Sequence, residues 1–134
     1  MPDSVVPSLA VDDLGNALTS FDGGREGAPP GDAPLPLASV APWHRRRVLM
    51  VLDRFSQSWE LSGGRIEQGE SPRQAAVREL LEESGQVPDG KLRFVGHAGF
   101  TPAPDRRAEY GALFTGCSAS VLDSQQIEEI ADIR

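Results

Sequence analysis

Residues 64–86 read GRIEQGESPRQAAVRELLEESGQ and hold the clearest secondary-structure signals of the chain. Ser71 stands where a helix N-cap is expected, and Gln74 stands at the capping-box position three residues later. Gly85 lies just past the last helical position, where a left-handed residue commonly ends a helix. We therefore predict a helix over residues 72–84.

On a helical wheel, this predicted helix has an apolar side and an acidic side. The apolar residues, which we expect to face a sheet, are Ala76, Val77, Leu80 and Leu81. The acidic side carries three carboxylates within about one turn: Glu79, Glu82 and Glu83. A hard divalent cation such as Mg²⁺ would turn their mutual repulsion into a binding site. The alternative is an acidic helix face that is only solvated.

The same residues resemble the Nudix box. In that box, Gly is followed by five residues, Glu, seven residues, and then Arg-Glu-aliphatic-any-Glu-Glu-any-Gly-aliphatic. The matching positions are Gly64, Glu70, Arg78, Glu79, Leu80, Glu82, Glu83 and Gly85. Gln86 departs from the pattern because it stands where an aliphatic residue is usual, and Ser62 stands where the family often has proline.

The resemblance implies an α/β fold, a Nudix-type α/β/α sandwich with a mixed sheet and a loop-helix-loop catalytic box. It also implies hydrolysis of a nucleoside diphosphate linked to another group, with Mg²⁺ or Mn²⁺ and a metal-activated water. The metal ligands implied by position are Glu79, Glu82, Glu83 and the backbone carbonyl of Gly63. Arg78 is implied to orient Glu79 by a charge-assisted hydrogen bond. The structural positions of the box are Gly64, Glu70 and Gly85.

Outside the box, the resemblance leaves the general base and the substrate open. The base is either Glu109, which begins a predicted strand over 109–117, or one of the box glutamates. Pro102 lies in a loop like that of the ADP-ribose-cleaving branch, whereas residues 59–64 resemble the lead-in of the branch that removes oxidised nucleoside triphosphates. Arg106 and Arg107 are candidate phosphate contacts. The alternative for this arginine pair is a solvated loop.

The chain length of 134 residues suits one domain. We expect residues 35–134 to form the Nudix-like domain. Residues 1–34 are expected to form an acidic, turn-rich arm that could contain a hairpin. Residues 124–133 carry isoleucines at helix-like spacing, but the chain stops before the closing helix that the resemblance implies. Without that helix, one face of the sheet would expose apolar surface that a second copy of the chain could cover, so we expect a possible homodimer.

The charge balance limits the classes of partner. Thirteen Lys and Arg against twenty Asp and Glu give a net charge of −7, which argues against a nucleic-acid polymer or an anionic membrane surface. A small nucleotide stays compatible, because a bound cation can reverse the local charge. The chain has no secretory signal and a single cysteine, so we expect it to be cytoplasmic. The alternative to an enzyme is a catalytically silent Nudix-fold nucleotide sensor or binding module, and the intact box glutamates favour the enzyme.

Overall fold

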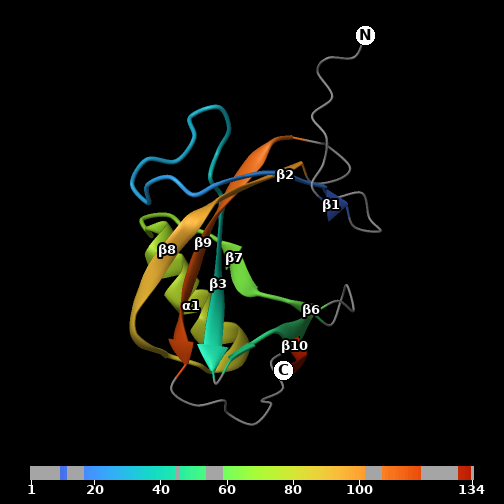
Figure 1. Ribbon diagram of the computed structural model, residues 1–134, viewed down its shortest axis with the longest axis vertical. Helices are drawn as coiled ribbons and strands as arrows, with labels where there is room; N and C mark the ends of the chain where they lie inside the picture. Colours follow the sequence, from blue (N-terminus) through green and yellow to red (C-terminus); the bar gives the residue numbers. More distant parts are fainter. Residues whose placement is uncertain are drawn as a thin grey trace.

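The computed structural model describes residues 10–11, 17–44, 46–53, 59–101, 107–118 and 130–133. These residues form two sheets and one helix (Figure 1). The larger sheet contains β1 (Ala10–Val11), β2 (Ala17–Asp22), β8 (Pro88–Thr101), β9 (Glu109–Ser118), β3 (Leu37–His44), β4 (Arg47–Val48) and β7 (Ser62–Arg65). The smaller sheet contains β10 (Ile130–Ile133), β5 (Val51–Asp53) and β6 (Trp59–Glu60). The helix is α1 (Pro72–Ser84).

The larger sheet is mixed, as the resemblance to the Nudix box implies. Strands β3 and β9 run parallel, whereas β8 pairs antiparallel with β2 and β9, and β7 pairs antiparallel with β3. Helix α1 packs on one face of this sheet, mainly over β7 and β3. The main buried residues between them are Ala38, Val40, Ala75, Ala76, Leu80, Ala112 and Phe114. The α/β class is therefore confirmed, and α1 is the helical layer in the part of the chain described.

Both ends of α1 are capped as predicted. The Ser71 side chain accepts a hydrogen bond from the Gln74 N–H at 3.1 Å, and the Gln74 side chain accepts one from the Ser71 N–H at 2.8 Å. Gly85 adopts a left-handed conformation with φ of 72° and donates to the Leu81 carbonyl. These hydrogen bonds satisfy backbone groups that a helix end leaves without a partner, so they fix the residues at which the helix begins and ends.

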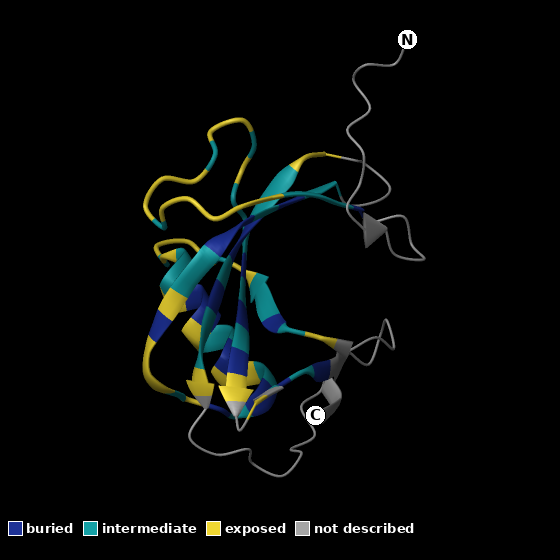
Figure 2. Ribbon diagram, viewed as in Figure 1, coloured by how far each residue is buried: buried dark blue, intermediate teal, exposed yellow. Residues whose placement is uncertain are grey.

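The predicted orientation of α1 is partly wrong. Ala76 and Leu80 are fully buried, but Val77 and Leu81 are 37% and 51% exposed. Figure 2 shows both buried and exposed segments along the helix. The helix is rotated so that small residues face the sheet and the carboxylate of Glu83 reaches the backbone of β7. A wheel built on apolarity alone contains no information about this contact with the strand.

The smaller sheet corrects one expectation from the sequence. The chain leaves β4 of the larger sheet at Leu49 and begins β5 of the smaller sheet at Val51. The end of the segment with helix-like isoleucine spacing is β10, which pairs with β5. Its β-branched residues suit a strand that completes the smaller sheet. The rest of that segment lies outside the described residues.

The N-terminal segment contributes to the larger sheet. β1 and β2 pair antiparallel, and β2 continues along β8 from Thr101 to His97. The loop after β2 is tied to the helix, because the Arg73 guanidinium donates to both carboxylate oxygens of Glu26. Arg73 also donates to the Leu92 carbonyl and lies 5.1 Å from the ring centre of Phe114. No described helix is both long and apolar enough to span a membrane.

Candidate active site

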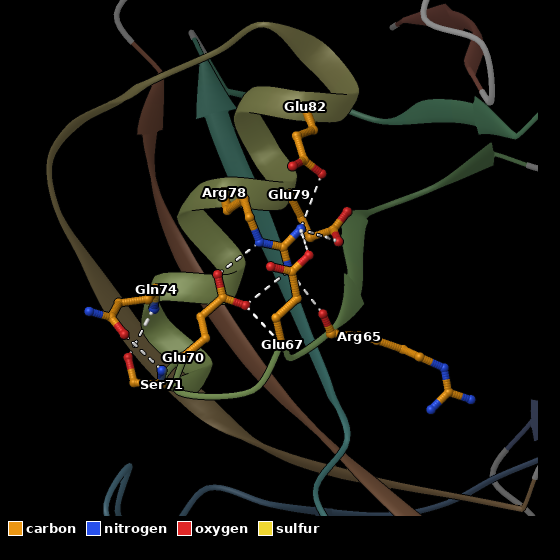
Figure 3. Close-up of polar contacts among 8 residues, drawn as sticks. All are labelled: Arg65, Glu67, Glu70, Ser71, Gln74, Arg78, Glu79 and Glu82. Carbon is orange, nitrogen blue, oxygen red and sulfur yellow. Dashed lines mark hydrogen bonds and ion pairs between the residues drawn. The ribbon is translucent and has the colours of Figure 1, made fainter.

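Arg78 lies at the centre of a cluster of carboxylates on α1 and the loop before it (Figure 3). Its Nε and Nη2 donate to the two oxygens of Glu70 at 2.8 and 3.0 Å, and its Nη1 donates to Glu79 at 2.9 Å. Nη2 also donates to the Arg65 carbonyl of β7 at 2.9 Å. One planar guanidinium therefore joins the loop, the helix and the strand, which a lysine could not do.

The loop before the helix holds Glu70 ready for this contact. The Glu70 carboxylate accepts from the Glu67 N–H at 3.0 Å, and Gly69 between them has φ of 82°. The hydrogen bond from Arg78, together with that N–H, holds the pKa of Glu70 below its usual range. Glu70 thus stays ionised, and the hydrogen bonds that it accepts raise the pKa of Arg78 in turn.

Two further carboxylates lie against the glycine pair of β7. The Gly63 N–H donates to Glu83 at 2.8 Å. A Cβ on Gly64 would come within 2.6 Å of a Glu79 carboxylate oxygen, so any side chain at that position would displace Glu79. Gly64 is therefore required by the close approach of helix and strand, whereas a Cβ on Gly63 would come within 2.6 Å of the Ala38 carbonyl oxygen of β3. Glu82 is different, because its side chain is 57% exposed and its contact is with Arg78 at 3.1 Å.

The environment of Glu83 favours its neutral form. Its pKa is raised to about 8, first by burial and then by the nearby carboxylates of Glu79 and Glu60, while the Gly63 N–H acts in the opposite direction. The Glu83 carboxyl therefore gives up its proton at a higher pH than a solvated glutamate does. A cation placed beside the pair would reverse this preference, because it stabilises the ionised form of both groups.

The donor chemistry of these residues fits a hard divalent cation. Carboxylate oxygens are the ligands that Mg²⁺ prefers, and the Glu79–Glu83 pair brings two carboxyl groups together. Within the described ranges, no three acidic, His or Cys side chains already converge on one point. Glu82 is the carboxylate with freedom to complete such a set, because it is mostly exposed.

The other predicted site residues lie apart from this cluster. Glu109 begins β9 opposite Phe100 of β8 and makes no contact with the box carboxylates among the residues described. β9 and β7 flank β3, so their backbones are about 10 Å apart. Arg107 is exposed before β9, whereas Pro102 and Arg106 lie outside the described residues.

Three contributions were not predicted from the sequence. The first is the Arg65 carbonyl, which accepts a hydrogen bond from Arg78. The second is the Glu67 carboxylate, which lies 3.7 Å from the Arg78 guanidinium. The third is Glu60, whose negative charge raises the pKa of Glu83. The first depends on backbone position, which no residue-type pattern reports. Glu60 and Glu67 flank β7 in the sequence and have no distinctive pattern there. They come close to the helix because β7 pairs with β3, the strand over which the helix packs.

A family comparison agrees with this geometry. The model of the NUDIX domain matches residues 36–134. The chain belongs to the Nudix family. The match covers the helix, the glycine pair and the carboxylates described above, so the family predicted from the sequence is confirmed.

Curated relatives match this Nudix chain over shorter segments. A putative 8-oxo-dGTP diphosphatase of Bacillus subtilis is 48% identical over 40 residues, which are 30% of this chain and 27% of that protein. An RNA pyrophosphohydrolase of Brucella ovis is 44% identical over 48 residues, 34% of this chain and 27% of that protein. An octanoyltransferase of Myxococcus xanthus is 45% identical over 73 residues, half of this chain and 20% of that protein. The matches therefore span about a quarter or less of each relative.

A solved structure supports the fold. The pyrophosphohydrolase BsRppH of Bacillus subtilis, determined as a point mutant, aligns with 93% of this Nudix chain and 74% of its own, with a TM-score of 0.73 and 17% identity. At that identity the likeness concerns the fold, which is the mixed sheet with α1 on one face.

Proposed function

We propose that the chain hydrolyses the diphosphate linkage of a small nucleoside diphosphate derivative with the help of Mg²⁺, with Mn²⁺ as a substitute. The observation that carries the proposal is the Glu79–Glu83 pair, held between Arg78 and the Gly63 N–H. Ionising both members of such a pair costs free energy, and a bound divalent cation offsets that cost. The names of two curated relatives, a diphosphatase and a pyrophosphohydrolase, support the reaction class.

In this proposal, each residue of the cluster has a distinct task. Glu79, Glu82, Glu83 and the Gly63 carbonyl would hold the metal, which supplies charge neutralisation of the diphosphate and a more acidic water. Arg78 positions Glu79 and is itself held by both oxygens of Glu70. Gly64 leaves the space that the Glu79 carboxylate fills.

The proton of the attacking water needs an acceptor. Glu109 of β9 is the proposed general base from outside the box, and a box glutamate is the other candidate. A Glu109→Gln variant separates the two. If Glu109 is the base, kcat falls by about 10²-fold or more and loses its acidic pH limb, as removal of a general base predicts. Unchanged kcat would assign the role to the box.

The nucleoside part of the substrate is proposed to occupy an apolar hollow next to β7. This hollow has a volume of about 220 Å³, and its lining includes Leu18, Phe21, Ser39, Phe100 and Leu113. Ser39 pairs directly with Gly63 of β7, and it alternates with the buried Ala38 and Val40, so its side chain faces away from α1. A nucleoside in this hollow would therefore reach the carboxylate pair around the edge of the sheet at β7. Aromatic rings at its rim suit a flat base. An ADP-ribose-like molecule and an oxidised dNTP are the two substrate classes proposed, with Pro102, Arg106 and Arg107 as further substrate contacts.

The test measures phosphate release, with and without Mg²⁺, from ADP-ribose, 8-oxo-dGTP, dNTPs, nucleotide sugars and a dinucleoside polyphosphate, using a coupled phosphatase or pyrophosphatase. Glu83→Gln should lower kcat by at least about 10²-fold if it removes a metal ligand. Glu67→Gln is the matched control, because that carboxylate is 67% exposed and 3.7 Å from Arg78. Equal activity of Glu83→Gln and the wild type would contradict the metal assignment. Binding of a nucleotide without any turnover would instead favour the sensor.

A further inference from the structure

A second hollow, with a volume of about 490 Å³, lies at the ends of β3 and β9, whose arrow tips are side by side in Figure 1. Its lining includes Trp43 of β3, Lys91 and Arg93 of β8, and Thr115 and Cys117 of β9. We call it the Trp43 hollow. A volume of this size is within the range of small-molecule sites.

The Trp43 hollow lies on the face of the sheet opposite α1. Val40 and Phe114 are paired and both belong to the core beneath the helix. Side chains alternate along a strand, so Thr115, the next residue after Phe114, faces the other side. The sheet therefore separates this hollow from the carboxylates of Glu79 and Glu83.

Strand register gives the hollow a floor and two unlike walls. Cys117 of β9 pairs with Trp43 on one side and with Asp89 on the other, and Thr115 pairs with Arg93. The short side chains of β9 form the floor between longer ones. Because neighbouring strands are about 4.8 Å apart, the backbones that carry the aromatic wall and the charged wall are roughly 10 Å apart.

The charges of this hollow differ from those of the whole chain. The chain has a net charge of −7, yet the hollow contains the cations of Lys91 and Arg93 against the single carboxylate of Asp89. Over the described ranges, the Arg93 guanidinium has no ion pair with a carboxylate. An exposed arginine beside a second cation attracts an anion, above all a phosphate, which a guanidinium can bind with two hydrogen bonds.

The aromatic wall formed by Trp43 favours a ligand that also contains a flat ring. Trp43 is 46% exposed, although it is the largest type of apolar side chain and lies within a hollow. A flat base stacked on the indole would cover it, and base stacking on an aromatic side chain is favourable for any base. Phosphate at one wall and a flat ring at the other, on strands whose backbones are about 10 Å apart, together describe a nucleoside monophosphate. Asp89 can accept a hydrogen bond from a ribose hydroxyl.

We propose that the Trp43 hollow binds a nucleoside monophosphate, separately from the carboxylate site on α1. The phosphate binds Arg93 and Lys91, and the base stacks on Trp43. A nucleoside monophosphate has no diphosphate linkage, so its binding here does not depend on the hydrolytic reaction proposed above.

Cys117 provides a direct readout of occupancy. It is exposed on the floor of the hollow and is the chain's one cysteine, so any thiol reaction of the protein reports this position. The experiment follows alkylation of Cys117 by iodoacetamide in the full chain, with EDTA present and AMP as the probe. We expect saturating AMP to slow alkylation severalfold, in the wild type and in Glu83→Gln alike. Adenosine alone and inorganic phosphate alone should protect much less at the same concentration.

Variants of the two walls complete the test. Arg93→Ala should weaken AMP protection about tenfold, the effect of losing a charged hydrogen-bond donor. Trp43→Ala should also weaken protection, and Trp43→Phe should restore it because an aromatic face remains. Arg65→Ala, a substitution at an exposed arginine of β7, is the matched control and should bind AMP as the wild type does.

Three results would overturn the proposal. One is no protection of Cys117 at millimolar AMP. Another is protection that survives Arg93→Ala unchanged in a folded protein, as checked by circular dichroism. The third is protection that Glu83→Gln abolishes, because it would place the AMP at the hydrolytic site.

Discussion

At the scale of single residues, the raised pKa of Glu83 makes the stability of the folded protein depend on pH. Its pKa of about 8 in the folded, metal-free protein lies above the ordinary value of 4.5. Between these two pH values the folded state therefore holds a proton that the unfolded chain has lost. Stability conferred by that proton is complete below about pH 4.5 and is lost as the pH rises towards 8.

The expected result is a melting temperature of the metal-free protein that falls between pH 5.5 and 8. Glu83→Gln carries a neutral side chain of the same shape, so its melting temperature should fall less over the same range. Thermal unfolding followed by circular dichroism, with EDTA present, measures both. Parallel curves for the two proteins would contradict the raised pKa. Glu70, whose pKa is lowered, does not confuse the test because it titrates below this window.

Substitution of Arg78 tests whether the positioning of Glu79 requires the planar shape of a guanidinium. Its nitrogens bind Glu70, Glu79 and the Arg65 carbonyl together. A lysine keeps the charge but has one nitrogen, so Arg78→Lys should lower kcat by about tenfold or more with a smaller change in KM. Arg65→Lys is a suitable control, because the Arg65 side chain extends away from the cluster and its backbone makes the contact (Figure 3). Steady-state kinetics of both variants decide the matter.

At the scale of elements, the rotation of α1 predicts opposite outcomes for adjacent leucines. Leu80 is fully buried and Leu81 is 51% exposed. Leu80→Ala should lower the free energy of unfolding by roughly 2–5 kcal/mol, because it opens a cavity in the core. Leu81→Ala should change it by less than about 0.5 kcal/mol. Urea unfolding measures both, and equal losses would show that the helix has another orientation.

The helix also shows what a sequence can and cannot predict. Its bounds follow from local signals, because Ser71, Gln74 and Gly85 act on backbone groups only a few residues away. Its rotation depends on β7, because the Gly63 N–H donates to Glu83 and Gly64 leaves space for the Glu79 side chain. A wheel ranks residues by apolarity and contains no information about a partner strand. It therefore placed Val77 and Leu81 wrongly.

The same distinction applies to Gln86. The sequence pattern has an aliphatic residue at this position, and the adjacent Val87 offers one at the next position along the chain. In the structure Gln86 is 3% exposed and Val87 is 64% exposed, so the polar residue keeps the buried position. Position along the backbone, set by the cap at Gly85, outweighs side-chain polarity here. Long-range pairing, such as that of β2 with β8, has no local signal at all.

At the scale of the whole molecule, net charge sets the effect of a bound cation on stability. The chain carries −7, and one Mg²⁺ would reduce this to −7 + 2 = −5. Four acidic residues of the box region share the single cation of Arg78, namely Glu67, Glu70, Glu79 and Glu82. A ligand that binds only the folded state stabilises it by mass action, so Mg²⁺ at about ten times its Kd should contribute about 1.4 kcal/mol.

This stabilisation should appear as a rise of a few degrees in melting temperature that saturates with Mg²⁺. Simple screening of a −7 chain would also raise it, so NaCl at equal ionic strength is the necessary control. The double variant Glu79→Gln/Glu83→Gln separates the two causes, because it keeps most of the net charge and loses two proposed ligands. If the metal binds at the box, the saturating rise is absent in that variant and only the screening effect remains. A rise of equal size in both proteins would place the cation elsewhere and would remove the physical basis for assigning Mg²⁺ to this helix.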